Sequence, residues 1–174
     1  DRIDPRRMID MANRFSRIRH APGTMSAGGR QRMMKGMAQY ADATARIYRT
    51  ILETTGAKTV LDSSKVPMLA WLMGEHPDVD LWPLHVTRDP RAVVYSWQRK
   101  KFDPAKGANM PQGSTLLTSL SWLAFNGIAT ALWSRRGERY LLVRYEDLTS
   151  NPRAVLDRIL EWFSEPMRAS QIID

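Results

Sequence analysis

A small group of cationic, hydroxyl and phenol side chains stands out, because such groups bind anions and orient reacting atoms. The group consists of Ser64, Lys65, Arg88, Ser96 and Tyr145. Cations neutralise the charge of a phosphate or sulfate, hydroxyl groups donate hydrogen bonds to its oxygens, and an aromatic ring offers a face to a base. Together, these residue types predict a site for a phosphorylated or sulfated nucleotide.

Arg88 belongs to the segment Leu84–Lys101, whose sequence predicts a strand, a turn and a helix. Asp89 is a typical N-cap residue, and Pro90 suits the first helical turn, where its missing N–H is not needed. The guanidinium of Arg88 would then lie beside a helix N-terminus, which is a common place for anions. The alternative is an ordinary strand-to-helix joint in which Arg88 pairs with an acid.

Three short apolar runs predict strands, at Lys58–Asp62, Leu81–Thr87 and Tyr140–Tyr145. Helical patterns separate them, so the chain is predicted to be an α/β protein with a parallel sheet. Ligands of such sheets gather at the carboxyl ends of the strands, and here each run is followed by polar residues. Ser63–Lys65, Arg88 and Tyr145–Asp147 are therefore expected at one edge of the sheet.

The helices that position these strands are indicated by apolar residues at three- and four-residue spacing. They are expected at Pro5–Arg19, at Gln31–Thr54, from Pro67, from Pro90, from Ser114 or Thr115 to Arg136, and from Asn151 to about Phe163. The methionines of the second helix are interpreted as core-filling side chains. Val93, Val94 and Trp97 would face the sheet. The helix that ends at Arg136 is apolar on nearly all sides, which predicts that it is largely buried. The loop Phe102–Gly113 is longer than connectivity requires and is expected to be a lid.

Composition excludes several kinds of site. The 174 residues contain no cysteine and three scattered histidines, so no Cys-ligated zinc, thiol nucleophile or histidine metal site is expected. The net charge is +8, but residues 1–50 carry eleven Lys/Arg and four Asp/Glu, whereas the rest carries fifteen and fourteen. A basic excess confined to the N-terminal helices weakens the case for a nucleic-acid binder. The apolar run Leu120–Trp133 is too short and too polar to span a bilayer.

Three sequence runs carry a resemblance to a known family. No GxxxxGK[ST], GxGxxG or GxSxG motif is present, so an ordinary kinase or dehydrogenase is not supported. Instead, VLDSSKVP, TRDPRAVVYSW and VRYEDLTSNPRAVLDRIL resemble, in this order and spacing, segments of the sulfotransferases that use 3′-phosphoadenosine 5′-phosphosulfate (PAPS). The resemblance covers residues 58–163. The runs SSK and YSWQRKK and the WxxxN pair, Trp122 and Asn126, look most like a bacterial subgroup.

The resemblance implies a role for each residue of the group. Arg88 and Ser96 would hold the 3′-phosphate, Tyr145 would lie near the adenine, Ser64 would contact the cofactor, and Lys65 would occupy the catalytic position. A lysine, with a reference pKa of about 10.4, fits poorly as a general base at neutral pH. It fits better as a cation that stabilises charge on the leaving phosphate or the transferred sulfuryl group. The alternatives are a solvated Lys65, a packing Tyr145 and a surface Ser96.

For the whole chain, the resemblance implies one sulfotransferase domain over 1–174, with a basic helical region, 1–55, and an α/β core, 58–163. The fold would be P-loop NTPase-like, with three layers formed by a central parallel sheet and helices on both faces. The first strand and the loop that grips the 5′-phosphosulfate are absent from this sequence, which starts at Asp1 rather than Met. We therefore expect a fragment that holds half of the cofactor site and is inactive alone.

The implied reaction transfers a sulfuryl group from PAPS to a hydroxyl or amine of a small-molecule, carbohydrate or lipid acceptor, without a metal. A cytoplasmic bacterial enzyme is expected, with no nucleic-acid partner and no membrane segment, and its oligomeric state is left open. Two alternatives remain. One is another nucleotide-dependent transferase, such as a kinase relative with the same sheet. The other is a basic nucleic-acid-binding module carried by residues 1–50.

Overall fold

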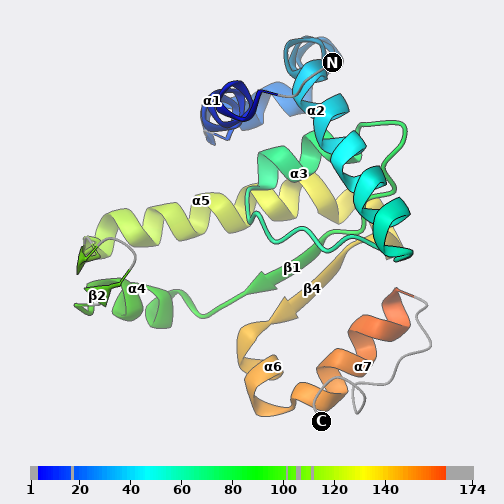
Figure 1. The fold of residues 1–174 in the computed structure, drawn as a ribbon. Coiled ribbons are helices and arrows are strands. Elements are labelled where there is room, and N and C mark those ends of the chain that lie inside the picture. The colour runs from blue at the N-terminus through cyan, green and yellow to red at the C-terminus, as the bar shows by residue number, and fades with distance from the viewer. Residues whose placement is uncertain (1–3, 17, 101, 105–106, 111, 164–174) are drawn as a thin grey trace. The chain divides into compact units, whose positions relative to one another are not determined.

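The computed structural model describes residues 4–16, 18–100, 102–104, 107–110 and 112–163 (Figure 1). Within these residues the chain is mostly helical, and it divides into two units, Asp1–Leu81 and Trp82–Asp174. The expected division into a basic helical region, 1–55, and a core, 58–163, stays a prediction.

The first unit is built from helices whose ends follow the capping signals of the sequence. Its elements are α1 (Pro5–Phe15), the 3-10 helix η1 (Ile18–Met25), α2 (Ala27–Thr55) and α3 (Pro67–Gly74). The side chain of Ser26 accepts a hydrogen bond from the Gly29 N–H at 3.1 Å and caps α2. Gly56 ends α2 in the left-handed conformation, with φ at 68°. The helix expected to run to Arg19 ends four residues earlier, at Phe15.

Apolar side chains of α2 and α3 form the core of this unit. Met68 and Leu72 of α3 are almost fully buried, Met37 of α2 is 7% exposed, and Trp71 stacks on Phe15 with ring centroids 6.4 Å apart. Burying a side chain of this size contributes about 1.5–3 kcal/mol. The core-filling role predicted for the methionines of the second helix is therefore confirmed for Met37.

The second unit contains a parallel pair of strands, as the sequence predicted. β1 (Leu84–Thr87) runs parallel to β4 (Leu141–Arg144), and Leu84 lies opposite Leu141 (Figure 1). Each strand leads directly into a helix, β1 into α4 (Pro90–Gln98) and β4 into α6 (Tyr145–Ser150). The remaining helices are α5 (Thr115–Trp133), the 3-10 helix η2 (Ser134–Arg139) and α7 (Pro152–Trp162). This pairing places the residues that follow both strands at one end of the sheet.

The strand expected over Lys58–Asp62 is not formed, and this part of the prediction is wrong. A strand persists only where a neighbour takes up its backbone hydrogen bonds. Among the described strands, β1 pairs with β4 alone, and Leu61 is 83% exposed. Local polar bonds shape the segment instead, because the Asp62 carboxylate accepts hydrogen bonds from the Tyr48 hydroxyl and, at 2.8 Å, from the Ser64 N–H.

The described residues therefore form two small two-stranded sheets rather than a clear three-layer fold. The second sheet pairs β2 (Phe102–Asp103) with β3 (Ala108–Asn109) in antiparallel fashion. It lies in the loop Phe102–Gly113, of which residues 105–106 and 111 are outside the described part. The lid role of this loop stays a prediction.

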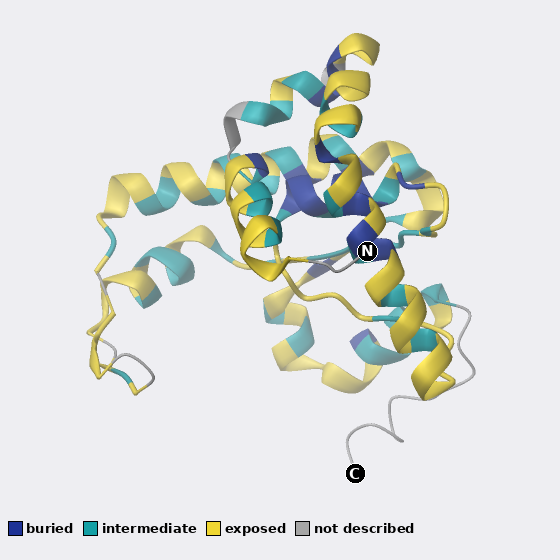
Figure 2. Cartoon of the chain, turned by 45° about the horizontal axis from the view of Figure 1, so that its top comes forward, coloured by how far each residue is buried: buried dark blue, intermediate teal, exposed yellow. Residues whose placement is uncertain are grey.

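Two expectations about burial are wrong. Trp97 does not face the sheet: it is 52% exposed, and its helix, α4, has no buried residue and packs on α5. The apolar helix α5 is not largely buried either, because four of its leucines are more than half exposed (Figure 2). These are Leu116, Leu117, Leu120 and Leu123. An apolar helix is buried all round only where other elements surround it, and within this unit α4 and the end of β1 cover one side.

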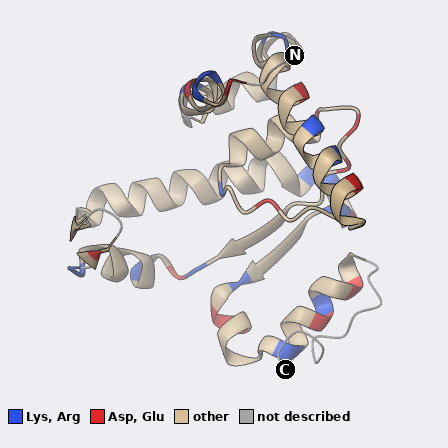
Figure 3. Cartoon of the chain, in the orientation of Figure 1, with Lys and Arg blue, Asp and Glu red and all other residues tan. Residues whose placement is uncertain are grey.

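The exposed α5 also bears on the question of a membrane. Neither Lys, Arg, Asp nor Glu occurs in this helix (Figure 3). Among the described residues, one helical stretch, Thr115–Arg139, which joins α5 and η2, is long and apolar enough to cross a membrane, and its most apolar 18 residues have a mean hydropathy of 1.3. One such helix is weak evidence, since length and composition are its whole basis. The absence of a membrane segment stays a prediction.

Candidate functional site

The turn between β1 and α4 carries Arg88 and Asp89. The Asp89 side chain caps α4 and accepts a hydrogen bond from the Arg91 N–H at 2.8 Å. The guanidinium of Arg91 folds back onto the same carboxylate, with Nη2 2.6 Å from Oδ2. The N-cap prediction is confirmed, and it changes the picture of the helix start: Asp89 itself occupies the N–H groups that an anion would use. An anion at this turn therefore depends on the side chain of Arg88.

The Arg91 guanidinium also sets the charge of the Asp89 carboxyl. Side-chain and backbone hydrogen bonds from Arg91 lower the pKa of Asp89 from 3.8 to about 2. A carboxyl with a lowered folded-state pKa stabilises the fold above its unfolded value, and this contribution is lost as the pH falls through about 2. Arg91→Ala is expected to raise the pKa of Asp89 toward 3.8, as measured by NMR titration of its carboxyl carbon. A pKa that remains near 2 would show that Arg91 is not the cause.

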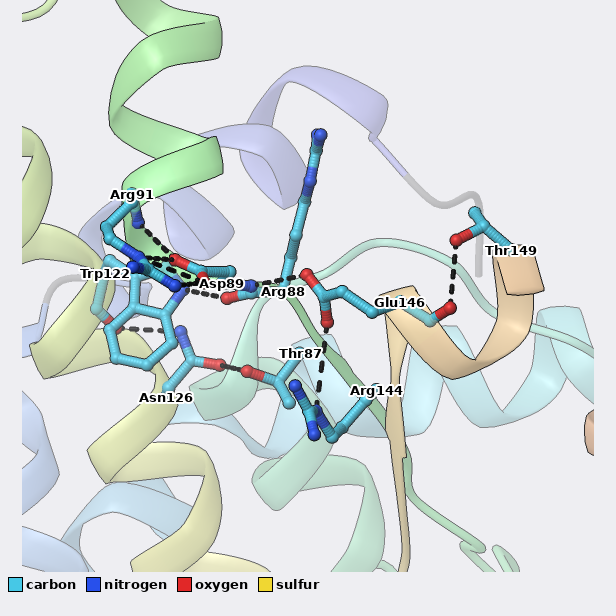
Figure 4. Close-up of polar contacts among 9 residues, drawn as sticks. All are labelled: Thr87, Arg88, Asp89, Arg91, Trp122, Asn126, Arg144, Glu146 and Thr149. Carbon is cyan, nitrogen blue, oxygen red and sulfur yellow. Dashed lines mark hydrogen bonds and ion pairs between the residues drawn. The ribbon is translucent and has the colours of Figure 1, made fainter. Parts of the chain in front are cut away.

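Glu146, at the start of α6, reaches across to the same turn. Its Oε1 accepts a hydrogen bond from the Asp89 N–H at 2.8 Å, and its Oε2 lies 3.9 Å from Nε of Arg144 (Figure 4). The Asp89 N–H is the main reason that the pKa of Glu146 lies below its ordinary value. Glu146 thus connects the residue after β4 with the turn after β1.

A second connection comes from α5. Nε1 of Trp122 donates a hydrogen bond to the carbonyl oxygen of Arg88 at 3.0 Å (Figure 4). The amide nitrogen of Asn126 donates to the Trp122 carbonyl oxygen at 2.8 Å, and its Oδ1 accepts from the Thr87 hydroxyl at 3.1 Å. The resemblance singled out this Trp-Asn pair as part of a buried helix. The structure shows instead that both residues bond α5 to the carboxyl end of β1.

His85 completes this network, and the hydrogen bonds determine its tautomer. Its Nε2 lies 3.0 Å from Oδ1 of Asn126, and its Nδ1 lies 2.8 Å from the Tyr140 hydroxyl. Because the Asn126 nitrogen already donates to Trp122, its oxygen is the acceptor, so Nε2 of His85 carries the proton. In the neutral ring, Nδ1 then accepts from the Tyr140 hydroxyl. His85 therefore bonds β1 to α5 and to Tyr140.

Arg88 and Tyr145 are brought together by the pairing of β1 with β4. The guanidinium carbon of Arg88 lies 4.8 Å from the centroid of the Tyr145 ring. Its side chain points away from Asp89 and Glu146 (Figure 4). Among the described acids, Asp89 is paired with Arg91 and Glu146 with Arg144, and none forms an ion pair with Arg88. The alternative in which Arg88 pairs with an acid is therefore wrong within the described residues.

The other candidate residues lie elsewhere. Ser96 is half-buried on α4, two turns beyond Arg88. Ser64 and Lys65 belong to the first unit, where both are exposed. Lys65 has a φ of 62°, the only positive value among described residues other than glycine. A lysine in this left-handed region is strained, and such strain is found at functional sites and in tight turns.

Sequence reasoning missed the contacts of Glu146 and Trp122. The sequence marks Glu146 only as one of the polar residues after a strand, and Trp122 only as part of a family resemblance. Both contacts join residues far apart in the chain, 57 positions for Glu146 and Asp89 and 34 for Trp122 and Arg88. No local pattern signals such pairs.

The described residues contain no group of three or more His, Cys, Asp or Glu side chains that could hold a metal ion. Their chemistry is that of a cation, Arg88, beside an aromatic ring at a strand end, which suits an aromatic anion such as a nucleotide. A scan against protein-family models and searches of curated proteins and of solved structures gave no match for the chain.

Proposed function

We propose that the chain is a sulfotransferase that uses PAPS and binds its nucleotide at the end of β1 and β4. One observation carries the proposal: Arg88 lies over the Tyr145 ring at the carboxyl ends of two parallel strands and has no described acid as a partner. Here both neighbouring carboxylates are already neutralised by other cations, which leaves the Arg88 guanidinium for an external anion.

In this proposal, Arg88 and Ser96 bind the 3′-phosphate, Tyr145 contacts the adenine, and Ser64 contacts the cofactor. The guanidinium now lies over the ring face that a base would use, so nucleotide binding moves it from the ring to the phosphate. The finer fold assignment, a three-layer P-loop NTPase-like arrangement, belongs to the same proposal. It is supported by the parallel β1–β4 pair and by the two helices that follow its strands.

The proposed reaction is an in-line displacement at sulfur. An acceptor hydroxyl or amine forms a bond to the sulfur of PAPS, the bond from sulfur to the bridging phosphate oxygen breaks, and adenosine 3′,5′-bisphosphate leaves. The acceptor proton passes to a base that we do not assign. Lys65 stabilises the negative charge that develops on the leaving phosphate, as cations do in phosphoryl transfer. We propose a small-molecule, carbohydrate or lipid acceptor in a bacterial cytoplasm.

Calorimetric titration with two nucleotides tests the proposal. Adenosine 3′,5′-bisphosphate is expected to bind at least about tenfold more tightly than adenosine 5′-monophosphate, because charged hydrogen bonds to the 3′-phosphate contribute about 1.5–3 kcal/mol each. The two ligands share the adenine and the 5′-phosphate, so their ratio isolates the 3′-phosphate. Equal affinities would contradict the proposed function.

A further inference from the structure

The peptide group that joins Arg88 to Asp89 is held by side chains at both of its ends. Its carbonyl oxygen accepts a hydrogen bond from Nε1 of Trp122 at 3.0 Å, and its N–H donates to Oε1 of Glu146 at 2.8 Å (Figure 4). The two side chains come from α5 and α6, and each lies far along the chain from its partner in the turn, 34 positions for Trp122 and 57 for Glu146. We call this pair of contacts the peptide clamp.

A peptide group held at both ends cannot rotate without breaking two hydrogen bonds. The peptide plane is rigid, and its orientation is set by the soft dihedral angles on either side of it. Strand β1 holds Thr87 on the other side of Arg88, opposite Arg144, so the two constraints together set the direction in which the Cα–Cβ bond of Arg88 leaves the turn. The bond to Glu146 has a charged acceptor, which makes it stronger than a bond between neutral groups.

Both sides of the clamp are themselves anchored to the strand ends. Glu146 lies 3.9 Å from Arg144, the last residue of β4. Trp122 is bonded through its carbonyl oxygen to Asn126, which accepts from Thr87, the last residue of β1. The position of Arg88 is therefore tied to the β1–β4 pair rather than to a free loop.

We propose that Trp122 and Glu146 are positioning residues that aim the Arg88 side chain at the anion site beside Tyr145. They touch the main chain of Arg88 and Asp89, and they act on the ligand through Arg88. The identity of the anion rests on the proposed function, whereas the clamp and the direction of Arg88 do not.

The test compares Glu146→Ala, Glu146→Gln and Trp122→Phe with the unchanged chain. The readout is the affinity ratio of adenosine 3′,5′-bisphosphate to adenosine 5′-monophosphate. Glu146→Ala and Trp122→Phe are expected to lower this ratio roughly five- to twentyfold, as the loss of a hydrogen bond predicts. Glu146→Gln keeps an acceptor for the Asp89 N–H, so this variant should retain most of the preference for adenosine 3′,5′-bisphosphate. Glu161→Ala and Trp97→Phe, at exposed positions of the same unit, are the matched controls.

If the two residues had a purely structural role, the variants would weaken the binding of both nucleotides equally. The affinity ratio would then stay unchanged, and this result would overturn the proposal. If the unchanged chain shows no preference for the 3′-phosphate, the proposed function fails, and the clamp is then judged by NMR. Hydrogen exchange of the Asp89 amide should be slow in the unchanged chain and clearly faster in Glu146→Ala. The Arg88 Nε–H should become more mobile in both Glu146→Ala and Trp122→Phe. An exchange rate and a mobility that do not change in these variants would overturn the clamp itself.

Discussion

Arg88→Ala is expected to reduce the affinity for adenosine 3′,5′-bisphosphate by about a hundredfold or more. The guanidinium can form two parallel hydrogen bonds to a phosphate, and each charged bond contributes about 1.5–3 kcal/mol. The structure offers no described acid as a competitor for Arg88, so the whole side chain is available to the ligand. Isothermal calorimetry measures the effect directly.

Two further variants make the Arg88 result specific. Arg99→Ala is a matched control, because Arg99 also lies over a tyrosine ring, 5.9 Å from the centroid of Tyr95. Arg99 is the C-cap residue of α4, at the opposite end of this helix from Arg88. Arg99→Ala should leave the affinity nearly unchanged. Arg88→Lys keeps the charge but not the planar fork, so it should restore only part of the affinity. If Arg88→Ala binds as tightly as the unchanged chain, the anion site lies elsewhere and the proposal is wrong.

Lys65→Gly is expected to change stability and activity in opposite directions. Lys65 has a φ of 62°, and a side chain in this left-handed region costs roughly 1–2 kcal/mol that glycine does not incur. The free energy of unfolding should therefore rise by about 1 kcal/mol in urea denaturation. Sulfuryl transfer from PAPS, measured in a protein that also supplies the loop for the 5′-phosphosulfate, should fall by about a hundredfold, because the cation that stabilises the leaving phosphate is removed.

Lys65→Ala separates the two effects. Alanine keeps the Cβ atom and with it the strain, so activity should fall without a gain in stability. Lys65→Arg keeps a cation and should retain more activity than either variant. If Lys65→Gly is stabilised but, in the same longer protein, transfers sulfate at the rate of the form that carries Lys65, Lys65 is a turn residue and the solvated alternative is correct.

The sequence alone determined most of the local structure. Helices α3 and α4 start at Pro67 and Pro90 as the sequence predicted, and α7 starts at Pro152, one residue after the predicted Asn151. Strands β1 and β4 also formed within a few residues of their predicted ranges. These features depend on caps, prolines, glycines and short apolar runs, whose effects reach only a few residues along the chain.

Features that depend on a distant partner were predicted poorly. The run Lys58–Asp62 has the composition of a strand, but in the described residues it has no strand to pair with. Likewise, α5 has the composition of a core helix, yet its leucines lie open because other elements of its unit cover only one side. Composition predicts which residues can be buried, whereas burial itself requires a second surface.

The candidate site shows the same difference between local sequence signals and contacts with distant residues. The sequence by itself identified Arg88 and Tyr145, because a cation and an aromatic residue after two predicted strands are local signals. Only the tertiary structure placed the Arg88 guanidinium over the Tyr145 ring and bonded Glu146 and Trp122 to the peptide between Arg88 and Asp89. The physical reason is the parallel pairing of β1 with β4, which brings together strand ends that are more than fifty residues apart in the chain.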